Sequence, residues 1–380
     1  MAEDREGKDT VFETDPDGGR ERVTRELDLT DAEIPVRSIP RFIRQMNEAG
    51  LQVQDVIATG GMAAVERVVD AALRRRVARK LLRKSLRYDK KAVAAFVREA
   101  HITGQLDHPN IVPVHELSVG EKDELYFTMK LVEGHTLEQI VRDLPPGQLD
   151  RSTLFDLLGV VVKVCDALAL AHSRGVLHAD IKPPNVMVGS YGQVYLMDWG
   201  IARLVPPRVD DGAKSETPVT SWVQTFPSEG ISGTPGFMPP EQAGERDLDL
   251  RADIFAVGTV VYFILARQAP YRARNAIESL RLAYRYQFPP LDQVAEVRVP
   301  RALSQIVRRA MAREPVNRYA SITEMRDELL AIGLSRYEEF EVDPTADRIT
   351  LTDLDALKER LRKPLGLVAE DSTSEAPDGY

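Results

Sequence analysis

The sequence shows no disulfide pair, no membrane span and no secretory leader. Its 380 residues include one cysteine, Cys165, which excludes an internal disulfide and fits a reducing compartment. Cys165 falls in an apolar helical pattern, so we expect it to pack rather than to react. No stretch reaches the roughly 18 apolar residues of a membrane helix. The N-terminus, MAEDREGKDT, lacks the apolar core of a signal peptide, so a cytoplasmic protein is expected.

An excess of positive charge is also absent. With 59 acidic and 50 basic residues, the formal net charge is -9, which argues against general binding to nucleic acids or anionic membranes. No internal repeat is visible. Hydrophobic residues make up 43% of the chain, enough for a substantial core.

The texture of the sequence changes along the chain. Residues 1–45 are polar and acidic, and they are predicted to form a mobile extension. Short apolar runs with β-branched residues predict a sheet with one amphipathic helix over residues 51–132. The predicted strands cover Leu51–Ile57, Ala64–Val69, Arg76–Leu82, Ile111–Leu117 and Leu125–Leu131, and the helix covers Lys90–Leu106.

Residues 133–332 are predicted to be mainly helical. Apolar residues recur at helical spacing from Leu154 to His172. The stretch Ile254–Ala266 is apolar on nearly every face, so we expect this helix at the centre of its lobe. Between these helices, two short runs flanking Gly189–Gly192 predict a hairpin. Residues 333–380 are expected to form a C-terminal extension with one short helix and a disordered end.

A loop of small residues lies between the first two predicted strands. It comprises Ile57, Ala58, Thr59, Gly60, Gly61, Met62, Ala63, Ala64 and Val65. Small residues allow backbone amides to approach a phosphate chain closely. Taken alone, the pattern is better explained as a glycine-containing hairpin turn.

Two charged residues follow the loop at suggestive positions. Lys80 lies on the third predicted strand, where its distance after a glycine loop favours a role in holding phosphates. Glu99 borders the apolar face of the next helix, between Phe96 and Ile102. An unpaired buried charge is unfavourable, so Glu99 needs a partner, and Lys80 is the natural candidate.

The most specific signal is the segment H-A-D-I-K-P-P-N at His178–Asn185. It is followed by the predicted hairpin and by D-W-G at Asp198–Gly200. Because a hairpin returns the chain to its start, two carboxylates, one amide and one lysine should gather at one end of it. An incidental polar turn would not require this spacing.

These side chains suit phosphoryl chemistry. Asn185 and Asp198 offer hard oxygen ligands for Mg²⁺. Asp180 remains free to orient a hydroxyl or accept its proton. Lys182 can neutralise charge on a phosphoryl group in transfer.

With these motifs in order, the sequence from about Leu51 to Ile332 resembles a eukaryotic-type (Hanks-type) serine/threonine protein kinase of the bacterial group. The resemblance implies an α+β, two-lobed protein kinase fold. A small antiparallel-sheet N-lobe with one key helix would cover residues 51–132, and a larger, mainly helical C-lobe residues 133–332. Other family positions are matched by Gly233-Thr234-Pro235, Pro239-Pro240-Glu241, Asp253 and Arg318.

The resemblance also implies an activity. The chain would transfer the γ-phosphoryl group of ATP to protein Ser/Thr hydroxyls in bacterial signalling, and it would also phosphorylate itself. Mg²⁺ would be the metal cofactor, with Mn²⁺ as a substitute. Lys182 resembles the serine/threonine pattern rather than the tyrosine-specific one.

Roles carried over from the family fall on matching positions. Asp180 would be the catalytic base, Lys182 would contact the γ-phosphate, and Lys80 would hold the other phosphates and pair with Glu99. Thr234 would bond the catalytic loop. The metal ligands would be Asn185 and Asp198. The phosphates of ATP would contact Lys80 and the loop from Ile57 to Val65. Its adenine would lie between Val65, Ala78 and Met187. Met129 would be the gatekeeper, and Lys130–Val132 would form the hinge. Glu241 and Arg318 would brace the C-lobe.

Several positions depart from the family pattern. Ala58 and Ala63 replace the first and third loop glycines, and Pro239 replaces an alanine. Ala179 replaces the arginine that normally receives a phosphorylated activation-loop residue. We therefore hypothesise that activity does not need loop phosphorylation, which alanine at Thr217, Thr220, Ser221 and Thr225 would test.

Two other functions stay open at this point. A pseudokinase, which binds ATP as a scaffold, is favoured by the alanines and opposed by the complete set of catalytic residues. A small-molecule phosphotransferase is opposed by the segment Gly233–Glu241, which resembles a platform for protein substrates. In the N-terminal segment, Thr10 and Thr14 lie near acidic residues and could recruit a phosphopeptide-binding module once phosphorylated, although a solubilising tail is the better explanation.

Overall fold

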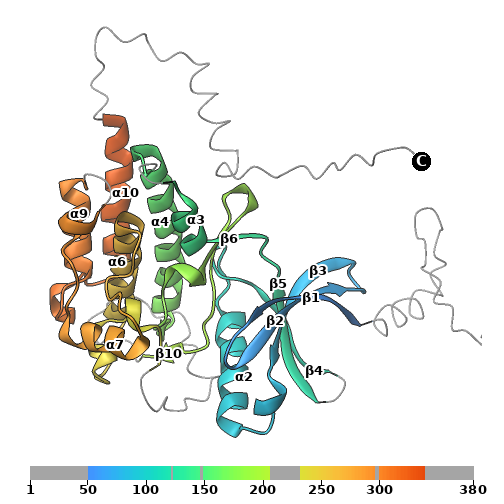
Figure 1. Cartoon of the computed structure of the whole chain (residues 1–380). Coiled ribbons are helices and arrows are strands. Elements are labelled where there is room, and N and C mark those ends of the chain that lie inside the picture. Colours follow the sequence, from blue (N-terminus) through green and yellow to red (C-terminus); the bar gives the residue numbers. More distant parts are fainter. Residues whose placement is uncertain (1–49, 121–122, 146–148, 206–231, 296–298, 339–380) are drawn as a thin grey trace, which may run out of the picture. The chain divides into compact units, whose positions relative to one another are not determined.

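The part of the chain that the computed structural model describes separates into a sheet and a larger helical region (Figure 1). It covers residues 50–120, 123–145, 149–205, 232–295 and 299–338. The predicted extension 1–45, residues 339–380 with the short helix expected in the C-terminal extension, and the loop residues Thr217, Thr220, Ser221 and Thr225 lie outside it. Among the described residues, no helix combines the length and apolarity that crossing a membrane requires.

The sheet is antiparallel and has five strands in the order β1-β2-β3-β5-β4. The strands are β1 (Leu51–Thr59), β2 (Ala63–Asp70), β3 (Arg75–Leu82), β4 (Val114–Gly120) and β5 (Glu124–Lys130). Four of them match the prediction to within two residues at each end. The fourth starts three residues late, because Pro113 lacks the N–H that a sheet ladder needs. Ile111 instead forms an isolated bridge with Leu196 of the helical region.

One helix of the sheet region, α2 (Lys90–Gln105), contacts β4 and packs on the sheet (Figure 1). It begins at Asp89, whose side chain accepts hydrogen bonds from the amides of Lys91 and Ala92. Such a cap satisfies amides that have no partner inside the helix. Phe96 and Ala100 place the apolar face of α2 in the core of the sheet region.

The helical region is built around α6. Its helices are α3 (Leu137–Asp143), α4 (Arg151–Ser173), α5 (Pro240–Ala243), α6 (Arg251–Ala266), α7 (Ala276–Arg285), α8 (Leu291–Val294), α9 (Arg301–Ala310) and α10 (Ile322–Glu338). All residues of α6 after Arg251 are buried, as its uniform apolarity predicts. Gly175, in the left-handed conformation at φ 72°, follows the end of α4.

Short strands connect the helical region to the catalytic motifs. The predicted hairpin is present as β8 (Val186–Gly189) and β9 (Val194–Leu196), with β6 (Gly134–Thr136) alongside β8. A second pair joins β7 (Val176–Leu177) to β10 (Arg203–Leu204). The two-lobed α+β architecture is thereby confirmed, and both motif segments lie at the ends of these short strands.

Candidate active site

A buried carboxylate of α6 fixes the backbone of the loop after β7. Asp253, which is 0% exposed, accepts hydrogen bonds from the amides of His178 at 2.9 Å and Ala179 at 3.0 Å. His172 Nε2 lies 2.8 Å from the same carboxylate. Three partners compensate for the burial of this charge. The loop that carries Asp180 is therefore anchored to the centre of the C-lobe.

The His178 ring joins this loop to the end of β9. Its Nε2 lies 3.0 Å from the carbonyl oxygen of Met197, and its Nδ1 lies 3.2 Å from the amide nitrogen of Asp180. A carbonyl can only accept and an amide N–H can only donate, so the proton is on Nε2. The neutral ring thus aligns the segments that carry Asp180 and Asp198.

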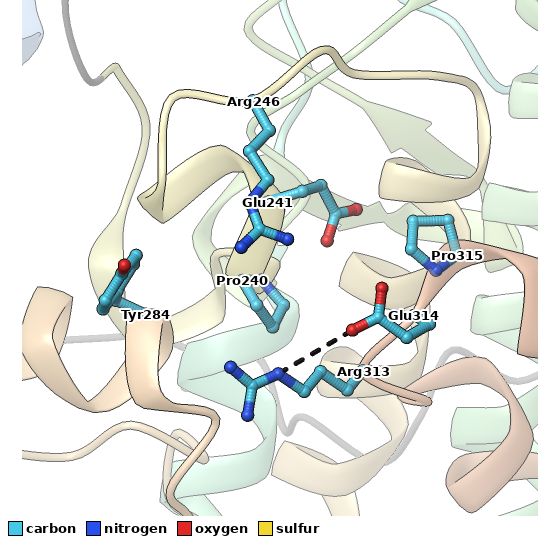
Figure 2. Close-up of a pocket in the computed structure, with 7 residues that line it drawn as sticks. All are labelled: Pro240, Glu241, Arg246, Tyr284, Arg313, Glu314 and Pro315. Carbon is cyan, nitrogen blue, oxygen red and sulfur yellow. Dashed lines mark ion pairs between the residues drawn. The ribbon is translucent and has the colours of Figure 1, made fainter.

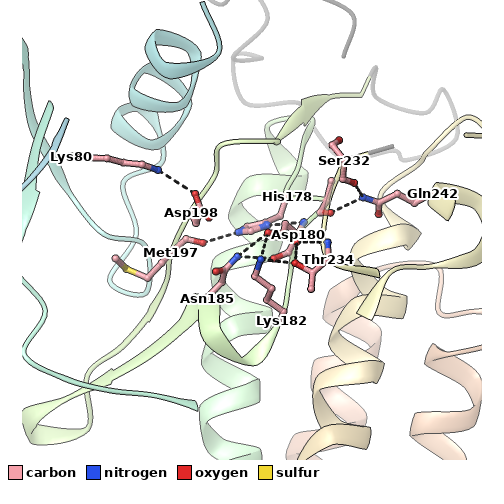
Figure 3. Close-up of polar contacts among 11 residues, drawn as sticks. Lys80, His178, Asp180, Lys182, Asn185, Met197, Asp198, Ser232, Thr234 and Gln242 are labelled. Atoms are coloured by element: carbon pink, nitrogen blue, oxygen red, sulfur yellow. Dashed lines mark hydrogen bonds and ion pairs between the residues drawn. The ribbon is translucent and has the colours of Figure 1, made fainter. Parts of the chain in front are cut away.

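The carboxylate of Asp180 is the point where the polar contacts converge (Figure 3). Its Oδ1 accepts from the amide and the hydroxyl of Thr234, each at 3.0 Å. Its Oδ2 accepts from Lys182 Nζ at 2.6 Å and from Asn185 Nδ2 at 3.3 Å. Lys182 also donates to the Thr234 hydroxyl at 2.6 Å. Donors from two separate segments therefore hold this carboxylate in one orientation.

A second charged cluster spans the two lobes. Lys80 Nζ lies 2.5 Å from Glu99 Oε1 and 3.2 Å from Asp198 Oδ1. Burial alone would lower the pKa of Lys80, but the attraction of both carboxylates outweighs it and raises that pKa. Burial would likewise raise the pKa of Asp198, and Lys80 lowers it instead. Both groups are charged at neutral pH, as a site for phosphates and a cation requires.

The oxygen donors left over fit a hard divalent cation. Asn185 Nδ2 donates to Asp180, and Asp198 Oδ1 accepts from Lys80. Asn185 Oδ1 and Asp198 Oδ2 accept no hydrogen bond from the described residues. The Met197 amide donates to the Asn185 carbonyl at 2.8 Å. This backbone hydrogen bond brings Asp198, the next residue after Met197, close to Asn185. Among the described residues, no cluster of three or more His, Cys, Asp or Glu could hold a metal by itself. One amide and one carboxylate oxygen match Mg²⁺, which keeps several waters and phosphate ligands.

The predicted nucleotide-contacting residues lie on both lobes. Ile57, Ala58 and Thr59 end β1, Gly60 to Met62 form the turn, and Ala63 to Val65 begin β2. Val65, Ala78, Met129 and Val132 belong to one apolar cluster of the N-lobe. Met187 lies on β8 in the three-stranded sheet. Lys80 is on β3, and Lys130 ends β5.

One departure from the loop pattern has a packing reason. Ala63 is buried in the N-lobe cluster, where it pairs across the sheet with Leu82. Its methyl group adds apolar contact and points away from solvent. Ala58 lies on β1 in an exposed position, paired with Val65. Neither alanine interrupts the hairpin, which is closed by a 2.8 Å hydrogen bond from the Gly60 amide to the Ala63 carbonyl.

The pair predicted to brace the C-lobe is present. Arg318 Nη1 and Nη2 lie 2.6 and 2.8 Å from the two oxygens of Glu241. A small recess adjoins Glu241 on the side where Arg246 and Arg313 point inward (Figure 2). Arg313 is in turn 4.0 Å from Glu314. The recess therefore belongs to the structural brace and lies apart from the Asp180 cluster.

Two contacts escaped the sequence analysis because they depend on tertiary placement. Lys130 was predicted only as part of the hinge, and its Nζ donates to the Tyr195 hydroxyl at 2.5 Å, which ties the hinge to β9. Gln242 follows the predicted Pro-Pro-Glu motif, and its side chain contacts the catalytic loop. Only its place directly after that motif could have drawn attention to it.

Comparison with known proteins agrees with this geometry. The protein kinase domain family matches residues 51–329. The chain is 32% identical over 284 residues to the serine/threonine-protein kinase PknD of Chlamydia felis, covering 72% of this chain and 30% of that protein. It is 31% identical over 285 residues to PknD of Protochlamydia amoebophila and 33% over 283 residues to PknD of Chlamydia pneumoniae, with similar coverage. The chain spans about 30% of the length of these relatives. It belongs to the family of bacterial, Hanks-type serine/threonine protein kinases.

Proposed function

We propose that this chain transfers the γ-phosphoryl group of ATP to serine and threonine hydroxyls of proteins, including its own. The observation that carries the proposal is the Asp180 carboxylate, held by Lys182 and Thr234. The Lys80–Asp198 contact crosses the lobes in the same site. The names of the relatives support the serine/threonine class.

In the proposed mechanism, Asp180 orients the acceptor hydroxyl and accepts its proton. Lys182, 2.6 Å from Asp180, stabilises the negative charge on the transferred group. Lys80, oriented by Glu99, holds the α- and β-phosphates. When bound, Mg²⁺ or Mn²⁺ supplies positive charge at the phosphate oxygens, and Asn185 and Asp198 hold it.

Nucleotide binding is assigned to the cleft side of the N-lobe. The loop from Ile57 to Val65 covers the phosphates through its backbone amides. Val65, Ala78 and Met187 enclose adenine, with Met129 as gatekeeper and Lys130 to Val132 as hinge. The proposed kinase domain covers residues 51–332 and is flanked by the extensions 1–45 and 333–380.

The partners proposed for this domain are proteins with serine or threonine acceptors. Signalling in the cytoplasm is the setting that fits, together with a phosphopeptide-binding module recruited by Thr10 or Thr14. Mass spectrometry of the chain after incubation with ATP tests the last point, since absence of phosphate on both threonines would rule it out.

Phosphoamino-acid analysis tests the proposed activity. The full chain is incubated with γ-labelled ATP, Mg²⁺ and a panel of basic proteins, sugars and aminoglycosides. We expect label on serine and threonine of the proteins only. Label on small molecules would indicate a small-molecule phosphotransferase. Bound ATP without any transfer would leave the scaffold function.

A further inference from the structure

A glutamine outside the predicted site bridges two segments of the catalytic centre. Gln242 of α5 is 5% exposed. Its Nε2 donates to the carbonyl oxygen of Ala179 at 2.9 Å and to that of Ser232 at 2.8 Å (Figure 3). A single side-chain amide thus joins the catalytic loop, at Ala179, to the segment that begins at Ser232.

The residue between these contacts fits only without a side chain. Gly233 has φ 118°, and a Cβ there would lie 2.8 Å from Gln242 Nε2 and 3.4 Å from the Ala179 carbonyl oxygen. The next residue, Thr234, donates its amide and hydroxyl to Asp180. The Gln242 bridge therefore lies two residues from the contact that orients Asp180.

Apolar packing surrounds the same point of the catalytic loop. Ala179 is buried together with Leu177 and Ala252. Further apolar side chains pack against this cluster from segments on both sides of the activation loop, namely Ile201, Val205, Leu248 and Leu250. A charged side chain at position 179 would need a partner in this environment. The loop is held here by apolar contacts, by the Asp253 carboxylate on the Ala179 amide, and by the Gln242 amide on the Ala179 carbonyl.

We propose that Gln242 is a positioning residue that keeps the segment Ser232–Thr234 on the catalytic loop. It performs, through hydrogen bonds, an ordering role that would otherwise require a phosphorylated residue opposite position 179. The effect of Gln242 on catalytic rate rests on the proposed kinase function. Its effect on structure, which is to fix the position of the Thr234 amide, does not depend on that function.

The kinetic test replaces Gln242 by methionine, which has similar length and no donor. We expect kcat per nucleotide-binding molecule to fall about tenfold or more, since two buried carbonyls lose their donor. The Kd of ATP should stay within about twofold, because Lys80 and Asp198 keep their contacts. Gln293→Met, at an exposed position on α8, is the matched control and should leave both values unchanged. If Gln242→Met does not bind ATP, Gln242→Asn, which is too short to reach both carbonyls, takes its place with the same expectation.

The structural test measures amide hydrogen exchange at Thr234, whose N–H donates to Asp180. Exchange should be about tenfold faster in Gln242→Met than in the wild type or Gln293→Met. Unchanged protection together with wild-type kcat would overturn the proposal, as would a lower melting temperature with kcat per binding site unaltered. If the wild type transfers no phosphate, the proposed function fails while the exchange measurement still decides the role of Gln242.

Discussion

At the scale of single residues, the site depends on charges with matched partners. The sequence predicted the Lys80–Glu99 pair from the position of an acid beside a buried stripe, and the structure confirms it at 2.5 Å. The contact of Lys80 with Asp198 was not predicted, because the two residues are 118 positions apart. Lys80 and Glu99 are 19 positions apart on neighbouring elements of one lobe, β3 and α2, whereas the contact between the lobes depends on the whole fold.

Lys80→Met should therefore destabilise the chain as well as stop transfer. Glu99 is 6% exposed, so loss of its partner leaves a buried charge and should lower the free energy of unfolding by about 3 kcal/mol. Urea denaturation measures this. The double variant Lys80→Met/Glu99→Gln should recover part of the loss. A double variant less stable than Lys80→Met alone would contradict the pairing.

At the scale of elements, helix packing decides whether a glycine can be replaced by a residue with a side chain. Gly159 on α4 has no atom within 4 Å of the position of a Cβ, whereas at Gly258 on α6 a Cβ would lie 2.9 Å from Ala310 Cβ of α9. The sequence predicted both helices from their periodicity. It could not predict which glycine is a contact point, since that depends on the approach of α9.

Alanine substitutions at these two glycines should change the stability of the chain in opposite directions. Gly159→Ala should stabilise the chain by about 1 kcal/mol through helix propensity. Gly258→Ala gains the same helix propensity, but the added methyl group overpacks the contact with α9, which costs about 1–3 kcal/mol of stability. On balance this variant should be less stable than the wild type. Thermal unfolding of both variants under one condition checks this. An equal rise in Tm for both would show that α6 and α9 are not in close contact.

Buried and exposed arginines offer a second contrast between elements. The side chain of Arg318 is 0% exposed and forms a bidentate pair with Glu241, whereas the Arg309–Glu324 pair is 41% and 39% exposed. Arg318→Lys should lose about 3 kcal/mol of stability because a lysine cannot replace the planar fork. Arg309→Lys should lose less than about 1 kcal/mol. Similar losses from denaturant titration would contradict the assignment of Glu241–Arg318 as a brace.

At the scale of the whole molecule, the order of motifs predicted the fold class and the catalytic loop, since each motif marks a strand end or turn. The contact of Gln242 with that loop and the contact of Lys130 with Tyr195 of β9 could not be predicted. Both bonds join segments more than 60 positions apart in the sequence, which meet only in the complete fold. The sequence thus predicted which groups carry the chemistry, and the fold supplies the contacts that orient these groups.

Control by loop phosphorylation is the second question at this scale. Ala179 and the Gln242 bridge favour activity without it. We predict that alanine at Thr217, Thr220, Ser221 and Thr225 together leaves turnover within about threefold. Steady-state kinetics of the quadruple variant checks this, and a fall of more than about tenfold would show that a loop phosphate is required.

The central proposal is that Asp180 orients the acceptor hydroxyl and accepts its proton during phosphoryl transfer. The most direct measurement follows labelled phosphate from Mg-ATP to a basic protein for the wild type and Asp180→Asn, with the Kd of ATP measured in parallel. We predict that Asp180→Asn transfers at least about 10²-fold more slowly while its Kd stays within about threefold. Equal transfer by both chains, or ATP binding by both with no transfer by either, would contradict the account.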